Sequence, residues 1–393
     1  MPGDQPTSST NFNSFVKGPK NMFKLLGIKL QKQDKLISTM YTFFVVISAT
    51  IVAILQLCQI LTSDTSDPHR VQNVVFITYF TVGLGKILNI LYRRSILIEC
   101  LSELEGIYPD KEMERKYSLQ HYLKRYKRAE YFFWNFAMFL ILLYNLETIV
   151  RSFLQLYFKG RYGYFLLVRI YTPFPYDGKL LVYLCYFTLG SITGAWIAVI
   201  IAAADLYLLG CVLQLCLHFE LLTKQLMELD TRIVNDTEAI KKLNAIAKYQ
   251  SELIRLSRKV NRTFSGSMIV SLTAASFIIC FLLFQLLGNV QLVDIAMVLI
   301  LLLNESKQVL LICYCGDKLL KSSQRFNESL YMHNWVDGSV RYQRHLLFML
   351  LYARNPIMLN LLDITDITLV TLKEVYGTAY RFFTVLKTAW TER

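Results

Sequence analysis

Long apolar runs without charged residues, separated by polar segments, dominate the chain. The cleanest run, residues 38–61, contains no charged residue at all. A helix needs about 20 mostly apolar residues to cross the hydrocarbon core of a membrane. By this measure seven segments are predicted to span: 38–61, 71–92, 131–152, 180–205, 264–287, 290–312 and 358–386. The pattern therefore predicts an all-α polytopic membrane protein with seven transmembrane helices.

Charge placement predicts the orientation of these spans. The chain has 393 residues, of which only 18% are charged, and its net charge is +13. The segments before the first span and after the second, fourth and sixth contain 30 lysines and arginines, whereas the opposite segments contain 7. Because positively charged loops stay in the cytoplasm, we expect a cytoplasmic N terminus and an extracellular C terminus. The excess charge follows the membrane, so nucleic acid is not an expected partner.

The polar segments predict how the chain is organised around the spans. Segments 100–130 and 219–262 have helical apolar spacing, which predicts long helices that pack together beneath the membrane as an anchor region. Near the N terminus, Phe23, Leu25, Leu26, Ile28 and Leu30 either lie on the membrane surface or belong to a flexible end with a short amphipathic helix. The expected parts are a cytoplasmic segment 1–37, six spans with cytoplasmic extensions 38–312, anchor helices 313–356, the last span 357–387 and an extracellular tail 388–393.

Motifs of enzymes and metal sites are missing. The five histidines are scattered, and the sequence contains no HExxH, nucleophile elbow, Walker or dinucleotide-binding pattern. The eight cysteines lack metal-ligand spacing and lie mostly in apolar segments, so we expect no structural disulfide. The sequence predicts no enzyme, no metal and no cofactor.

Aromatic and small polar residues gather in the outer halves of several predicted spans. Such a set suits a pocket for a small hydrophobic ligand, although helix packing and the interfacial aromatic belt remain the alternatives. The candidate ligand-binding residues are Phe76, Tyr79, Phe80, Tyr144, Asn145, Tyr183, Tyr186, Phe187, Phe281 and Met297. The aromatic segment 153–179, with its two prolines, predicts a shaped loop over that site.

Charged residues inside the spans are of two kinds. Glu147 and Arg151 are one turn apart and are expected to pair. Lys86, Glu305 and Lys307 are expected either to snorkel or to pack against cytoplasmic helices.

The last span has the most charge. A charge at the bilayer centre costs about 2.5–3.5 kcal/mol, so this helix is not expected to face lipid. A stripe at helical spacing combines charged and small residues: Asp366, Val370, Lys373, Gly377, Arg381 and Thr384. The stripe predicts a helix that lines water in a pore or transport path, with a buried ion-pair network as the alternative.

The C-terminal part resembles a known family. Residues 313–339, 353–356 and 378–387 are similar to the C-terminal signature of insect odorant receptors, and residues 171–177 resemble the second outer loop of that family. The matching positions are Gly316, Ser323, Tyr331, Trp335, Ala353, Pro356, Tyr380, Phe383, Thr384 and Leu386. Gustatory receptors usually have Gln-Phe where this chain has Val385-Leu386, which favours the odorant branch.

The resemblance implies a ligand-tuning subunit of an odorant-gated, non-selective cation channel. Such a subunit binds a small volatile organic ligand and assembles with an odorant co-receptor as a heterotetramer in the plasma membrane of a sensory dendrite, in contact with membrane lipid. It implies assembly contacts at Tyr331, Trp335 and Tyr380, and a gate at Phe383, Leu386 and Lys387.

Basic residues at Arg381 and Lys387 depart from the family, because a ring of four lysines would repel cations. The alternatives are a gustatory-type channel, a membrane transporter and a metabotropic seven-span receptor.

Overall fold

The fold is almost entirely helical. The computed structural model describes residues 12–29, 36–63, 69–160, 163–175, 179–229, 235–287, 292–354, 356–361 and 365–391. Its helices are α1 (Phe12–Leu25), α2 (Leu36–Thr62), α3 (His69–Tyr92), α4 (Arg94–Gly106), α5 (Lys111–Lys116), α6 (Gln120–Lys159), α7 (Leu180–Met227), α8 (Asp236–Gln285), α9 (Leu292–Met332), α10 (Val340–Ala353) and α11 (Leu369–Thr391). Two short strands, β1 (Asn360–Leu361) and β2 (Thr365–Asp366), pair antiparallel.

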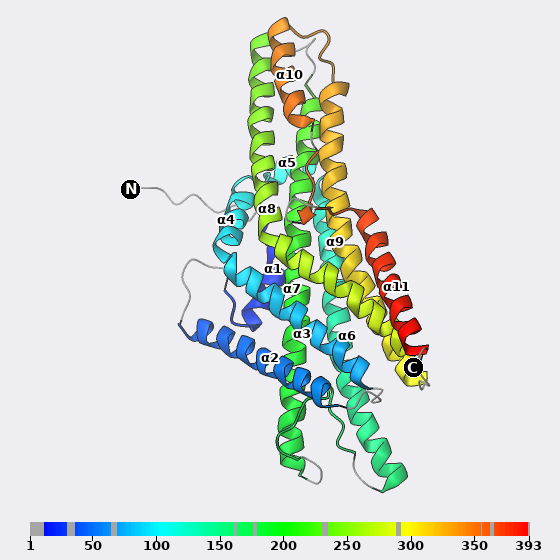
Figure 1. The fold of residues 1–393 in the computed structure, drawn as a ribbon. Helices are drawn as coiled ribbons and strands as arrows, with labels where there is room; N and C mark the ends of the chain where they lie inside the picture. The colour runs from blue at the N-terminus through cyan, green and yellow to red at the C-terminus, as the bar shows by residue number, and fades with distance from the viewer. Residues whose placement is uncertain are drawn as a thin grey trace.

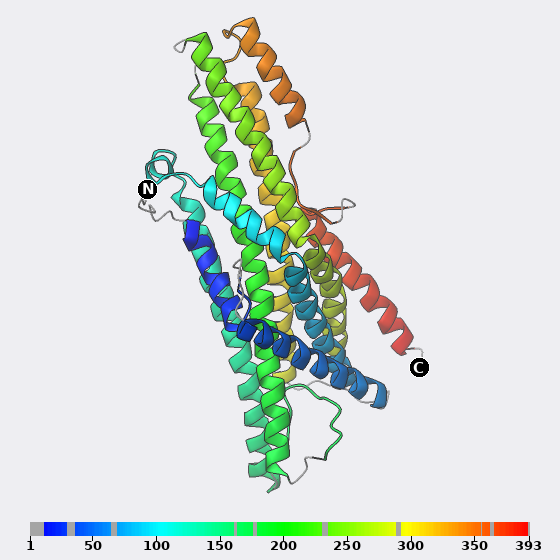
Figure 2. The same ribbon diagram turned by 90° about the vertical axis from the view of Figure 1, so that its left-hand side faces the viewer.

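Three long helices set the shape of the molecule. Helices α7, α8 and α9 run along an elongated bundle, and α10 lies with their ends at one extremity (Figures 1 and 2). We call this extremity the anchor end. Helix α7 lies at the centre, and nearly every residue between Ala202 and Leu222 is buried. A helix that is apolar on all sides needs neighbours on all sides, which explains its central position.

Within the described residues, six helices are long and apolar enough to cross a membrane: α2, α3 from Arg70, α6, α7, α8 and α9. Helix α11 is the seventh helix of the predicted set, and it carries Lys373, Glu374, Arg381 and Lys387. These charges lower its apolar content, so its place in the bundle identifies it more clearly than its hydropathy. The prediction of a seven-helix, all-α membrane protein is confirmed.

The beginning of the last span was predicted wrongly. Helix α11 begins at Leu369 and not near residue 358, because β1 and β2 precede it. The Ile367 amide donates to the Leu359 carbonyl (2.8 Å), and both side chains are buried. This hairpin lies on α9 at Gly316, where a Cβ atom would collide with the Ile367 carbonyl oxygen. Asp366 therefore lies on a strand, while Asp363 lies outside the described residues.

The N-terminal segment contains the short amphipathic helix of the second expectation, but this helix packs into the bundle instead of belonging to a flexible end. Helix α1 packs into the bundle against α7 and α6, with Phe12, Phe15 and Phe23 buried. The Phe23 ring stacks on Tyr207 of α7, with ring centroids 5.5 Å apart. Of the apolar residues expected on the membrane surface, Phe23, Leu26 and Ile28 are buried in protein, Leu25 is exposed, and Leu30 lies outside the described residues.

Candidate functional site

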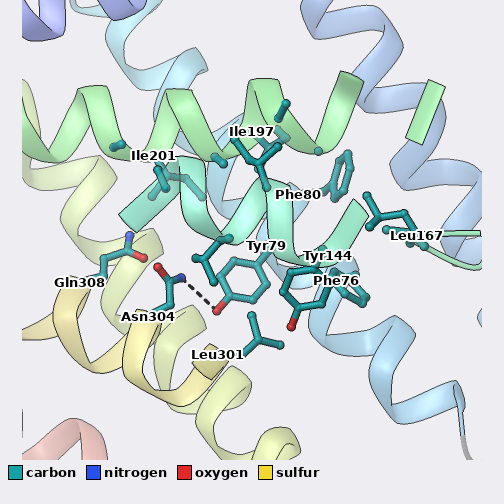
Figure 3. A pocket seen from close by; sticks show the side chains of 18 of the residues that line it. Phe76, Tyr79, Phe80, Tyr144, Leu167, Ile197, Ile201, Leu301, Asn304 and Gln308 are labelled. Atoms are coloured by element: carbon teal, nitrogen blue, oxygen red, sulfur yellow. Dashed lines mark hydrogen bonds between the residues drawn. The ribbon is translucent and has the colours of Figure 1, made fainter. Parts of the chain in front are cut away.

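A cavity of about 140 Å³ opens between α3, α6, α7 and α9. Figure 3 shows its lining, with Phe76, Phe80, Tyr144 and Leu167 toward one side and Asn304 and Gln308 toward the other. An apolar cavity of about 150 Å³ is large enough for benzene. The cavity therefore suits a compact ligand with roughly one ring.

One side of the cavity is aromatic and apolar. The Phe76 and Tyr144 rings meet edge to face, with centroids 5.9 Å apart. The loop after α6 adds Leu167 and Val168 to the lining, as expected for a shaped loop over a site. The Tyr171 amide donates to the Leu55 carbonyl at the end of this loop (3.0 Å), which ties it to α2.

The opposite side is polar, and we call it the inner end: Asp205 of α7 with Asn304, Lys307 and Gln308 of α9. The Asn304 side-chain amide donates to the Tyr79 hydroxyl (3.4 Å), and Lys307 Nζ donates to the side-chain oxygen Oδ1 of Asn304 (3.1 Å). The Lys307 ammonium also lies over the Phe133 and Phe136 rings, 4.6 and 4.7 Å from their centroids. These contacts hold the lysine beside the cavity.

Lys86 and Asp205 form a buried ion pair at this end, between α3 and α7. Lys86 is 1% exposed and Asp205 is 4% exposed. Glu305 is buried as well. Of the two alternatives expected for Lys86 and Glu305, snorkelling is therefore wrong, because both side chains lie inside the bundle, where a charge needs an opposite charge or hydrogen bonds.

Five of the ten candidate ligand contacts line this cavity: Phe76, Tyr79, Phe80, Tyr144 and Asn145. Tyr183 instead donates to the Phe165 carbonyl (2.9 Å), and its ring packs on Phe187. Tyr186 packs on the main core, Phe281 packs on a smaller cluster around Ile278, and Met297 is half-buried without lining the cavity.

The sequence reading missed the inner end. Asp205, Asn304 and Gln308 were not candidates, although all three interrupt apolar runs. Polar residues inside a membrane-spanning helix are a usable signal, because each needs a partner there.

Toward the C-terminal end of α6, Arg151 pairs with Glu147, as expected, and also with Asp294 of α9. This ion-pair cluster joins the two helices beyond the cavity.

Helix α11 has two distinct faces. Thr371, Val375 and Ala379 are buried against the bundle, and the Phe382 ring stacks on Phe277 of α8 (5.2 Å, 10°). The opposite face is exposed and consists of Val370, Lys373, Glu374, Gly377 and Arg381. Asp366 does not join this stripe, since it precedes the helix.

The residues predicted at the gate and at assembly contacts lie on different faces. Phe383 and Leu386 are half-buried, whereas Lys387 and Tyr380 are exposed. At the anchor end, Tyr331 is 69% exposed and its carbonyl accepts from the Trp335 indole (2.9 Å). One face of α10 is also apolar and exposed: Val340, Leu347, Phe348, Leu351 and Tyr352.

A buried histidine supports the anchor end just after α9. His333 Nδ1 donates to the Leu330 carbonyl (3.0 Å), so Nε2 accepts from the Tyr342 hydroxyl (2.9 Å). Burial lowers the pKa of His333 below its ordinary value. The pair thus fixes α10 with a neutral histidine.

Comparison with known proteins identifies the family. The family model described as 7tm odorant receptor matches residues 68–380. The chain belongs to the insect odorant receptor family. It is a family of receptors and not of enzymes, so the predicted family and the prediction of no enzyme are both confirmed.

Relatives and solved structures extend this match. Putative odorant receptor 92a of Drosophila melanogaster is 29% identical over 307 residues, covering 76% of this chain and 73% of the relative. Odorant receptor 85b of the same species is 25% identical, covering 84% and 85%. The olfactory receptor OR5 of Machilis hrabei has the same fold, with a TM-score of 0.76 over 96% of this chain and 99% of OR5, at 12% identity.

Proposed function

We propose that this odorant receptor binds a small volatile ligand in the cavity and opens a cation channel that it forms with a co-receptor. The proposal places it in the plasma membrane of a sensory dendrite, with its anchor end in the cytoplasm and its C terminus outside. The orientation follows from the distribution of lysine and arginine along the chain.

One observation carries the proposal: the cavity and the exposed helix share a short segment of α9. Asn304, Lys307 and Gln308 line the cavity. Between them, the Ser306 hydroxyl accepts a hydrogen bond from Tyr376 of α11 (2.6 Å). A ligand that shifts this segment also shifts the contact with α11, so binding favours one arrangement of that helix over another.

The exposed stripe of α11 supports a pore formed by several subunits. Its charges avoid the packed face, and in lipid each would cost several kcal/mol, on the order of 3. Surrounding them with water between subunits removes that cost. Because Arg381 and Lys387 disfavour cations, we place co-receptor subunits around the same pore, with Phe383, Leu386 and Lys387 near its gate.

The apolar surface at the anchor end supports assembly. We assign the exposed face of α10, together with Tyr331 and Trp335, to contacts with neighbouring subunits. Tyr380 extends these contacts to α11. A structure of OR5 from Machilis hrabei contains eugenol, which supports a small organic ligand for a receptor of this fold.

The test is a current recording in cells that express the chain with an insect odorant co-receptor. We expect odorants to evoke a rapid cation current while G-protein signalling is blocked. Tyr376→Phe removes one hydrogen bond between α9 and α11 and is expected to raise the half-maximal odorant concentration by about threefold to tenfold.

Tyr157→Phe, at an exposed site on α6, is the matched control and should leave the response unchanged. A current that requires G protein would contradict the proposal. A robust odorant-gated cation current from this chain alone would contradict the role assigned to the co-receptor.

A further inference from the structure

The inner end of the cavity contains two deeply buried polar atoms that lack hydrogen-bond partners within the described part of the chain. They are Oδ2 of Asp205 and Nε2 of Gln308. Both residues line the cavity, and each is 4% exposed. An unpaired buried polar group costs about 1–3 kcal/mol, so a ligand that pairs with these atoms recovers that cost.

These two atoms need opposite kinds of hydrogen-bond partner. A carboxylate oxygen only accepts hydrogen bonds, whereas the amide nitrogen of glutamine only donates. The Asp205 carboxylate already accepts from Lys86 through Oδ1, which fixes its position. A hydroxyl group is the smallest ligand group that donates to one atom and accepts from the other.

The charges around the inner end exclude ionised ligands. Lys86 and Asp205 neutralise each other as an ion pair, and Lys307 and Glu305 add one basic and one acidic side chain beside them. The set is balanced, so a carboxylate or an ammonium ligand would add an uncompensated charge in a buried site. A neutral polar group avoids that cost.

We propose that the cavity selects neutral alcohols or phenols, with the hydroxyl between Asp205 and Gln308 and the apolar body among Phe76, Phe80 and Tyr144. This ligand class rests on the proposed function, because it assigns the chemistry of the same cavity. Hydrocarbons leave both inner atoms unpaired, and aldehydes, ketones and ethers leave the Asp205 oxygen unpaired. The cavity volume restricts the body to roughly one ring.

The test compares three ligands of equal heavy-atom count: benzyl alcohol, benzaldehyde and ethylbenzene. In cells expressing the chain and a co-receptor, we expect benzyl alcohol to act at a concentration about tenfold lower than the other two. Gln308→Leu should raise the half-maximal concentration of benzyl alcohol about tenfold and leave the half-maximal concentration of ethylbenzene nearly unchanged. Gln324→Leu, at an exposed position of the same helix, is the matched control.

The wild-type comparison needs no variant and is decisive if Gln308→Leu fails to reach the surface. Equal or better activity of ethylbenzene, or no response to benzyl alcohol where other odorants open the channel, overturns the hydroxyl subsite and leaves the proposed function standing. Thermal melting of the purified chain with the same ligands tests ligand binding without a current. It identifies the case in which the hydroxyl subsite is correct and the channel function is wrong. Stronger stabilisation by benzyl alcohol than by ethylbenzene, without any odorant-evoked current, supports the subsite and overturns the channel function.

Discussion

Lys86 and Asp205 are buried against each other between α3 and α7, whereas Lys373, Glu374 and Arg381 lie on an exposed face of α11. Both sets lie in helices of the membrane bundle. The first set is neutralised inside one subunit, by an ion pair that joins residues distant in the sequence. The second set points away from the subunit. The difference shows that charges on a membrane helix are compensated either by other residues of the same subunit or by the surroundings of the subunit.

The two regions should respond differently to loss of charge. In the buried pair, removal of one partner leaves the other charge desolvated and uncompensated. On the exposed face, the charge already contacts its surroundings, so its removal changes electrostatics more than folding. Stability and ion permeation are therefore separate measures of the two regions.

The largest effect is expected from Lys86→Met. Asp205 would then be buried without its partner, and the free energy of unfolding should fall by about 3–5 kcal/mol. Thermal melting of the detergent-solubilised protein measures this loss, and surface expression in cells reports its consequence. Lys86→Met combined with Asp205→Leu should recover most of it, because a pair of apolar residues needs no charge compensation.

Lys321→Met is the matched control for that substitution. Lys321 pairs with Asp317 one turn away on α9, and its side chain is 59% exposed. We expect a change below about 1 kcal/mol. Equal losses at Lys86 and Lys321 would show that the buried pair contributes nothing special to stability.

A smaller effect is expected at the anchor end, where the buried His333 side chain is hydrogen-bonded to the Leu330 carbonyl and the Tyr342 hydroxyl. Burial lowers its folded-state pKa below the ordinary value of 6.5, so the unfolded chain binds more protons. This contribution to stability is complete above pH 6.5 and declines as the pH falls below it. The loss should approach, at most, about 1.4 kcal/mol per pH unit.

Melting temperatures between neutral and mildly acidic pH measure the effect of His333. His333→Gln should flatten the dependence, while His345→Gln, at a less buried site on α10, should preserve it. An unchanged slope in His333→Gln would place the acid sensitivity elsewhere.

The smallest effect on stability is expected from Arg381→Gln, within about 0.5 kcal/mol. If the exposed stripe of α11 lines water, removal of this positive charge should increase cation conductance through channels formed with the co-receptor. Single-channel recording measures the conductance, and Arg325→Gln, at an exposed site of α9, serves as control. A large loss of stability without any change in conductance would place Arg381 in packing rather than beside the pore.

The sequence carried the helical architecture but not every boundary. Apolar runs long enough to cross a membrane have few other uses, so the first six spans were readable directly. The segment before α11 was misread because Leu361, Ile364 and Ile367 extend the apolar pattern, although Thr and Asp alternate with them. Packing of that hairpin on Gly316 decides its conformation, and the contact joins residues far apart in the chain.

For the cavity, the sequence by itself determined which helices have aromatic side chains at a common depth, because helical spacing fixes depth along one element. Only the tertiary structure decided which of them meet. Phe76, Tyr79, Phe80 and Tyr144 converge, whereas Tyr183 turns toward the Phe165 carbonyl. Rotation of each helix about its axis depends on packing against neighbours distant in sequence. The same packing places Lys86 beside Asp205, so the lysine forms an ion pair with a residue that lines the cavity instead of reaching the membrane surface.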